Sequence, residues 1–149
     1  MDRPTLRPAP PPILPLDGMP PPTPGDYLCA LRAGDRERVY LLHLPPAIRE
    51  GRALPLVVML HGRASSSRHF SRLTGMSATA ARAGFVAVYP QGTDRPGGRQ
   101  LTWNGGFCCG YAREAGVDDV GFLRGLIERL HATYGTDPRR TYAAGHSNG

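Results

Sequence analysis

Residues 145–149 read Gly-His-Ser-Asn-Gly and match the pattern G-x-S-x-G. In a nucleophile elbow this pattern places a serine on a sharp turn between a strand and a helix, and the glycines let both elements pack closely. The segment directly follows Arg140–Ala144, which is predicted to be a short strand. This context favours a nucleophilic Ser147 over the alternative, an ordinary Gly-Ser turn.

Acyl transfer by a serine also needs an oxyanion hole, in which two backbone amides stabilise the negative charge that develops on the carbonyl oxygen. We expect one amide from Asn148, the residue after the nucleophile. We expect the other from residues 60–63, Leu-His-Gly-Arg, because the loop after an early buried strand supplies it in this arrangement.

Two histidines lie near these segments in the sequence. We expect His61 to orient its loop through hydrogen bonds, and the ring of His146 to point away from Ser147. The general base of such a serine follows the elbow in chain order, after an acid. Neither position occurs up to Gly149, so we expect the 149-residue chain to be inactive alone.

The elements that would position these residues alternate in type along the chain. A β-hairpin is predicted around Gly34-Asp35, between apolar runs at 27–31 and 38–44. Further elements are listed in chain order: a strand at 56–60, a polar loop at 61–68, a helix through 78–83, a strand at 85–89, a long loop at 91–116 and a helix from 118 to 135. This order predicts an α/β domain with an open, mostly parallel sheet and helices on both faces.

The helix before the elbow strand has the clearest periodicity. Its apolar residues recur every three or four positions and are expected on one buried face: Val120, Leu123, Ile127, Leu130 and Tyr134. Asp118 and Asp119 stand at its start, where carboxylates accept hydrogen bonds from free amides and oppose the helix dipole. Helix capping therefore accounts for both carboxylates.

The amino-terminal segment differs in composition from the rest. Residues 1–24 contain ten prolines, so we expect residues 1–25 to be an extended, disordered leader and residues 26–149 to form the domain. A plain linker is favoured over a ligand for an SH3-type domain. The start shows no signal peptide.

Composition excludes several classes of function. The net charge of +6 arises from 18 basic residues, all of them arginine and scattered along the chain, which argues against nucleic-acid binding. No apolar run is long enough to span a membrane. The three cysteines lack the spacing of a metal site, and no metal or cofactor is implied. For Cys108 and Cys109 two alternatives remain, a bridge to a cysteine elsewhere or a pair of buried thiols.

Several blocks together resemble the esterase family of poly(3-hydroxybutyrate) depolymerases and related feruloyl and acetylxylan esterases. In family order they are residues 38–45, 57–62, 89–92, 103–104, 108–110, 117–122 and 137–140, followed by the elbow at 145–149. The resemblance extends over about residues 26–149. It implies the amino-terminal half of an α/β-hydrolase fold, truncated at the elbow.

The resemblance also implies roles for individual residues. Ser147 would be the nucleophile, and the backbone amides of Arg63 and Asn148 would form the oxyanion hole. Trp103 would line the acyl or sugar pocket or belong to the core. The expected substrate is a carboxylic ester: a polyester, a feruloylated xylan, an acetylated sugar or a small ester. Members are commonly exported. The alternatives are an acyltransferase of this fold and a binding protein that has lost its triad.

Overall fold

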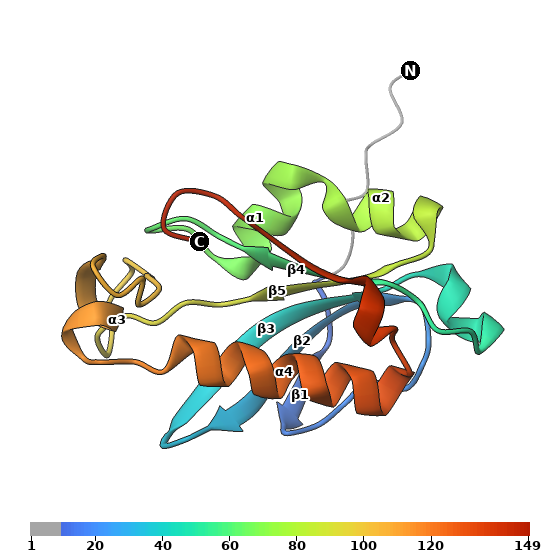
Figure 1. Ribbon diagram of the computed structural model, residues 1–149, viewed down its shortest axis with the longest axis horizontal. Coiled ribbons are helices and arrows are strands. Elements are labelled where there is room, and N and C mark those ends of the chain that lie inside the picture. The colour runs from blue at the N-terminus through green and yellow to red at the C-terminus, as the bar shows by residue number, and fades with distance from the viewer. Residues whose placement is uncertain (1–9) are drawn as a thin grey trace.

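The computed structural model describes residues 10–149, and in it a single sheet lies between two layers of helices (Figure 1). The strands are β1 (Ile13–Leu16), β2 (Gly25–Ala33), β3 (Arg36–Leu44), β4 (Leu56–Leu60), β5 (Val86–Pro90) and β6 (Thr141–Gly145). The α-helices are α1 (Ser67–Thr74), α2 (Met76–Ala83), α3 (Gly110–Glu114) and α4 (Asp119–Tyr134). Short 3-10 helices span Pro46–Glu50 and Pro138–Arg140.

The strand order across the sheet is β1-β2-β3-β5-β4-β6. The predicted hairpin is confirmed, because β2 and β3 pair antiparallel with Ala33 opposite Arg36. β3 and β5 also pair antiparallel, whereas the other neighbours are parallel, so the sheet is mixed. β4 and β6 are parallel neighbours with Leu60 opposite Gly145. The segments that follow them therefore leave the sheet side by side.

The two faces of the sheet have separate cores, as expected for a sheet covered on both sides. Alternate residues of β3 point to opposite faces: Tyr40, Leu42 and Leu44 join a cluster with residues of α4, and Leu41 joins a cluster with residues of α1 and α2. Figure 1 shows α4 on one side of the sheet and α1 with α2 on the other. The prediction of an α/β domain is confirmed.

Regular structure begins earlier than the expected boundary near residue 26. β1 lies within the proline-rich segment and pairs parallel with β2, with Ile13 opposite Leu28. Proline is tolerated there because β1 is an edge strand in the described sheet. Residues 1–9 lie outside the described residues, so the expectation for the rest of the leader stays a prediction.

The region between β4 and β6 contains two helices that periodicity did not reveal. α1 begins within the predicted polar loop, where the Ser66 side chain accepts a hydrogen bond from the His69 amide. Its buried residues are only Ser67 and Phe70, which leaves a weak apolar pattern. α3 lies inside the predicted long loop 91–116, and it too is short.

α4 confirms the predicted helix, and four of the five residues predicted for its apolar face (Leu123, Ile127, Leu130 and Tyr134) lie in or against the core, whereas Val120 does not. The buried side chains are Asp119, Phe122, Leu126 and Leu130, while Val120 is 66% exposed. Val120 is exposed because Asp119, its neighbour on the helix, turns toward the interior. Asp118 caps the helix as expected, since its carboxylate accepts a 2.8 Å hydrogen bond from the Gly121 amide. Capping does not account for Asp119, whose partner is Arg38.

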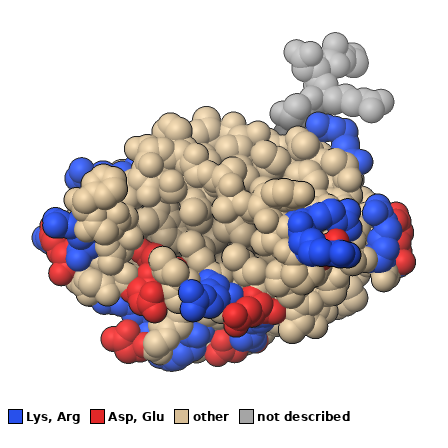
Figure 2. All heavy atoms as spheres, viewed as in Figure 1, with Lys and Arg blue, Asp and Glu red and all other residues tan. Residues whose placement is uncertain are grey.

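Charged side chains of both signs lie along the lower edge and at both ends of the face shown in Figure 2, whereas the upper centre, over β6, is largely uncharged. Among residues 10–149, no helix is both long and apolar enough to cross a bilayer.

Candidate active site

The turn after β6 has the backbone conformation of a nucleophile elbow. Ser147 has a φ of 55°, in the left-handed region that residues other than glycine rarely adopt. The Gly149 amide donates a 2.9 Å hydrogen bond to the His146 carbonyl and closes the turn. The Ser147 side chain is exposed. Ser147 therefore lies with left-handed backbone inside a tight turn that directly follows a strand.

Two glycines allow the elbow to lie against the loop that follows β4. A Cβ atom added to Gly62 would lie 3.0 Å from Nδ1 of His146 and 3.5 Å from Cβ of Ser147. A Cβ atom added to Gly149 would collide with the Leu60 carbonyl oxygen. The absence of side chains at these positions therefore permits the close approach of the two segments.

His61 has the orienting role that the sequence predicts. Its buried ring accepts a 3.0 Å hydrogen bond at Nε2 from the Gly92 amide, and its Nδ1 lies 2.8 Å from the Gly62 carbonyl oxygen. A neutral ring with its proton on Nδ1 satisfies both contacts. Burial lowers the pKa of His61 below its ordinary value of 6.5. Both ring nitrogens are occupied, so His61 orients the loop.

The backbone amides of Arg63 and Asn148 belong to these two adjacent segments. The His146 amide donates to the Leu60 carbonyl at 3.2 Å and connects the segments directly. Within residues 10–149, neither the Arg63 amide nor the Asn148 amide donates to a backbone acceptor. The side chain of Arg63 is engaged separately, since it donates a 3.0 Å hydrogen bond to Oε1 of Gln100.

Trp103 joins the elbow to the loop after β4, a connection that sequence reasoning missed. Its backbone amide donates to Oδ1 of Asn148 at 2.8 Å, and Nδ2 of Asn148 donates to its carbonyl at 3.1 Å. Its indole Nε1 donates to the His61 carbonyl at 2.8 Å. Trp103 is only 4% exposed and belongs to the core cluster, which favours the core interpretation over the pocket interpretation.

The segment after Trp103 is attached to the start of α4. The Asn104 amide donates to Oδ2 of Asp119 at 2.7 Å, and Oδ1 of the same carboxylate accepts from Arg38 at 2.6 Å. Burial lowers the pKa of the Arg38 guanidinium, and the hydrogen bond that it donates to Asp119 opposes that shift. The Arg38 guanidinium also lies over the Phe122 ring, 4.0 Å from its centroid.

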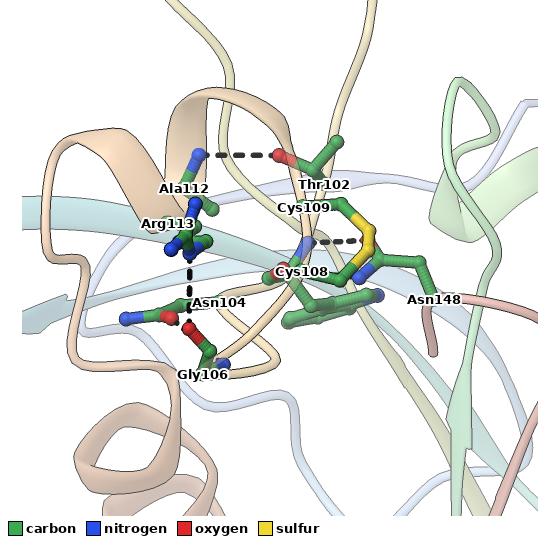
Figure 3. The surroundings of a disulfide bond; sticks show 9 residues. Thr102, Asn104, Gly106, Cys108, Cys109, Ala112, Arg113 and Asn148 are labelled. Atoms are coloured by element: carbon green, nitrogen blue, oxygen red, sulfur yellow. Dashed lines mark hydrogen bonds between the residues drawn. A yellow bond between two sulfur atoms is a disulfide. The ribbon is translucent and has the colours of Figure 1, made fainter.

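Cys108 and Cys109 form a disulfide with each other, beside the side chain of Asn148 (Figure 3). The sequence favoured a bridge to another cysteine or a pair of buried thiols, and the structure instead pairs the two adjacent sulfur atoms. The adjacent side chains turn to the same side of the loop, so each sulfur atom meets its neighbour. The Gly105 amide donates to the Cys108 carbonyl, and Arg113 donates to the Gly106 carbonyl at 3.0 Å.

No general base is in place beside the serine among the described residues. None of the five histidines of the chain has a hydrogen bond to Ser147 Oγ. The His146 ring lies against Gly62, at the position given above. The structure describes no group of three or more His, Cys, Asp or Glu residues that could hold a metal ion within residues 10–149.

A hollow of about 360 Å³ lies beside the loop after β4. Arg63 lines one side of it, and Thr102, Gly110 and Tyr111 line another. Ser147 is not among its lining residues.

Residues 38–149, which include the loop, the Trp103 segment and the elbow, match the sequence profile of the family described as Esterase PHB depolymerase. The chain belongs to this esterase family. Two relatives are also similar in sequence. The protein described as "Putative esterase NocK" from Nocardia uniformis subsp. tsuyamanensis is 32% identical over 117 residues, which cover 76% of this chain. Feruloyl esterase B from Piromyces equi is 30% identical over 112 residues, which cover 75% of this chain.

Solved structures of other hydrolases share the fold of this chain. A ferulic acid esterase matches 84% of the chain and 50% of its own length, with a TM-score of 0.61 at 15% identity. An S-formylglutathione hydrolase from Agrobacterium tumefaciens matches 82% of the chain and 48% of its own length, with a TM-score of 0.59 at 15% identity. The chain spans 32% of the length of NocK and 20% of that of feruloyl esterase B.

Proposed function

We propose that this chain supplies the nucleophile and the oxyanion hole of a serine ester hydrolase with an α/β-hydrolase fold. The observation that carries the proposal is the left-handed backbone of Ser147, at the end of β6 and next to the glycine loop after β4. Membership of the esterase PHB depolymerase family supports ester bonds as the target.

In the proposed reaction, Ser147 Oγ attacks the carbonyl carbon of a carboxylic ester. The carbonyl oxygen becomes negatively charged and accepts hydrogen bonds from the amides of Arg63 and Asn148. The intermediate collapses to an acyl-enzyme as the alcohol leaves with a proton. Water then attacks the acyl carbon and releases the acid and the free serine.

The base and acid of the triad are proposed to come from residues outside this chain. In this fold the acid and then the histidine follow the nucleophile in chain order. His61 is unsuited to the task because both of its ring nitrogens are engaged by backbone groups. The proposed substrates are polyesters or ester groups attached to plant polysaccharides, by analogy with the family and with feruloyl esterase B.

A fluorophosphonate probe tests the proposal in the complete protein, because it reacts with activated serines. We expect labelling at Ser147 and hydrolysis of a short-chain ester, both abolished by Ser147→Ala. Ser71→Ala on α1 is the matched control and should change neither result. An unlabelled protein that binds a polysaccharide without hydrolysing esters would contradict the proposal and favour the binding protein. Acyl transfer to an added alcohol in preference to water would favour the acyltransferase.

A further inference from the structure

We propose that Trp103 is a positioning residue that fixes the relative position of the two amide donors of the oxyanion hole. It does so through hydrogen bonds to His61 on one side and to Asn148 on the other. This inference rests on the proposed function, because it gives Trp103 a task only if the two amides stabilise an oxyanion. Trp103 lies 45 residues before the elbow in the chain and belongs to neither donor segment.

The first observation is that a single residue contacts both donor segments. The indole Nε1 donates to the carbonyl of His61, two positions before Arg63, at 2.8 Å. The backbone amide and carbonyl of Trp103 form two hydrogen bonds with the Asn148 side chain, at 2.8 and 3.1 Å. A pair of hydrogen bonds fixes both the position and the orientation of the Asn148 amide group. Trp103 thus links the two donor segments a second time, in addition to the direct hydrogen bond from the His146 amide to the Leu60 carbonyl.

The second observation is that Trp103 itself is held rigidly. Its ring is buried in the core cluster, with its centroid 5.2 Å from that of the His61 ring. The next residue, Asn104, makes two hydrogen bonds. Its backbone amide donates to the Asp119 carboxylate at 2.7 Å, and its side-chain amide donates to the Val117 carbonyl at 3.0 Å. Supporting contacts of this kind are what hold a functional group within a fraction of an ångström of its working position.

Geometry matters here because oxyanion donors act over a narrow distance range. They stabilise the transition state when they lie about 2.7–3.1 Å from the developing oxyanion, and they contribute little to binding the ground state. Loss of the Trp103 contacts should therefore lower kcat and leave KM nearly unchanged. If Trp103 instead lined the substrate pocket, its replacement would raise KM.

The test compares Trp103→Phe and Asn148→Ala in the complete protein. Trp103→Phe keeps an aromatic ring in the core and removes the indole N–H, while Asn148→Ala removes the side-chain pair and keeps the backbone amide. We expect each variant to lower kcat about 10–100-fold, the scale of a misplaced catalytic group, with KM within about 2-fold. The double variant should lose less than the product of the two single effects, because both act through the same connection.

Leu126→Ala on α4 is the matched control, because Leu126 is fully buried in the same core cluster but lies on a helix that belongs to neither donor segment. It should lower the melting temperature at least as much as Trp103→Phe and leave kcat close to that of the wild type. A kcat loss in Trp103→Phe no larger than in Leu126→Ala, or a loss expressed mainly in KM, would overturn the inference. Hydrolysis that persists in Ser147→Ala would instead refute the proposed function.

Discussion

Arg38 and Asp119 form an ion pair at 2.6 Å between β3 and α4, and their side chains are only 4% and 5% exposed. The second carboxylate oxygen of Asp119 accepts a hydrogen bond from the Asn104 amide, so the Asp119 carboxylate also fixes the segment that follows Trp103. A buried pair of this kind is costly to break, because removal of one partner leaves the other charge without compensation.

Replacement of the neighbouring aspartates should therefore have very different effects on stability. Asp119→Asn leaves the Arg38 guanidinium buried and uncompensated, so we expect it to lower the free energy of unfolding by about 3–5 kcal/mol. Asp118→Ala removes an exposed helix cap and should cost about 1 kcal/mol. Denaturant unfolding of the complete protein measures both. Equal losses in the two variants would contradict the role assigned to Asp119.

The burial of His61 should make the stability of the protein depend on pH. Burial lowers its pKa in the folded state, so below pH 6.5 the unfolded chain binds a proton that the folded chain does not. The free energy of unfolding should accordingly be highest above this pH and should fall as the solution becomes more acidic. The slope from this one group cannot exceed about 1.4 kcal/mol per pH unit. In His61→Asn, the free energy of unfolding measured by the same denaturant method should fall less steeply between pH 7 and pH 5 than in the wild type. Parallel curves for the wild type and this variant would count against a neutral, buried His61.

The sequence predicted β4, β5, β6, the hairpin and α4 because each has a local signal. A run of apolar residues such as Leu56–Leu60 or a glycine stop such as Gly135 is visible within a few positions. The elbow was predictable for the same reason, since its pattern is five residues long.

The missed features depend on contacts between residues far apart in the sequence. Nothing local to Trp103 indicates that its amide meets Asn148, and nothing local to Asp119 separates a buried ion pair from a helix cap. In the sequence the Trp103-Asn104 dipeptide is distinctive only as part of the family resemblance. β1 was missed because prolines around it suppress the usual strand signal, although an edge position tolerates them.

The 149-residue chain should show no hydrolysis that depends on Ser147. Within residues 10–149 no histidine contacts its hydroxyl, and without a base a serine is a weak nucleophile at neutral pH. The measurement is the release of a chromogenic alcohol from an activated acetate ester, with Ser147→Ala as the baseline. Turnover by the chain above that baseline would refute this expectation.

The chain by itself should also self-associate through β6. Within the described sheet β6 pairs with β4 alone, and Tyr142 on this strand is 56% exposed. The surface over β6 is largely uncharged (Figure 2). Open apolar edges recruit further strands, and a charge on the edge prevents this. Light scattering after size-exclusion chromatography should detect oligomers that Tyr142→Lys reduces. A monodisperse wild-type monomer with a sharp, cooperative melt would contradict this prediction.

The proposed site combines Ser147 with two backbone amides, one of them from Arg63. The most direct measurement is kcat/KM of the complete protein for a simple ester, in Arg63→Ala and Arg63→Pro, with melting temperatures as a check on folding. Alanine keeps the amide and removes only the side chain that contacts Gln100, so we expect a small effect. Proline removes the amide, and we expect a loss of about 10²–10³-fold, the scale of one oxyanion donor. If Arg63→Ala were as damaging as Arg63→Pro, the side chain would be the active group and the proposed oxyanion hole would be wrong.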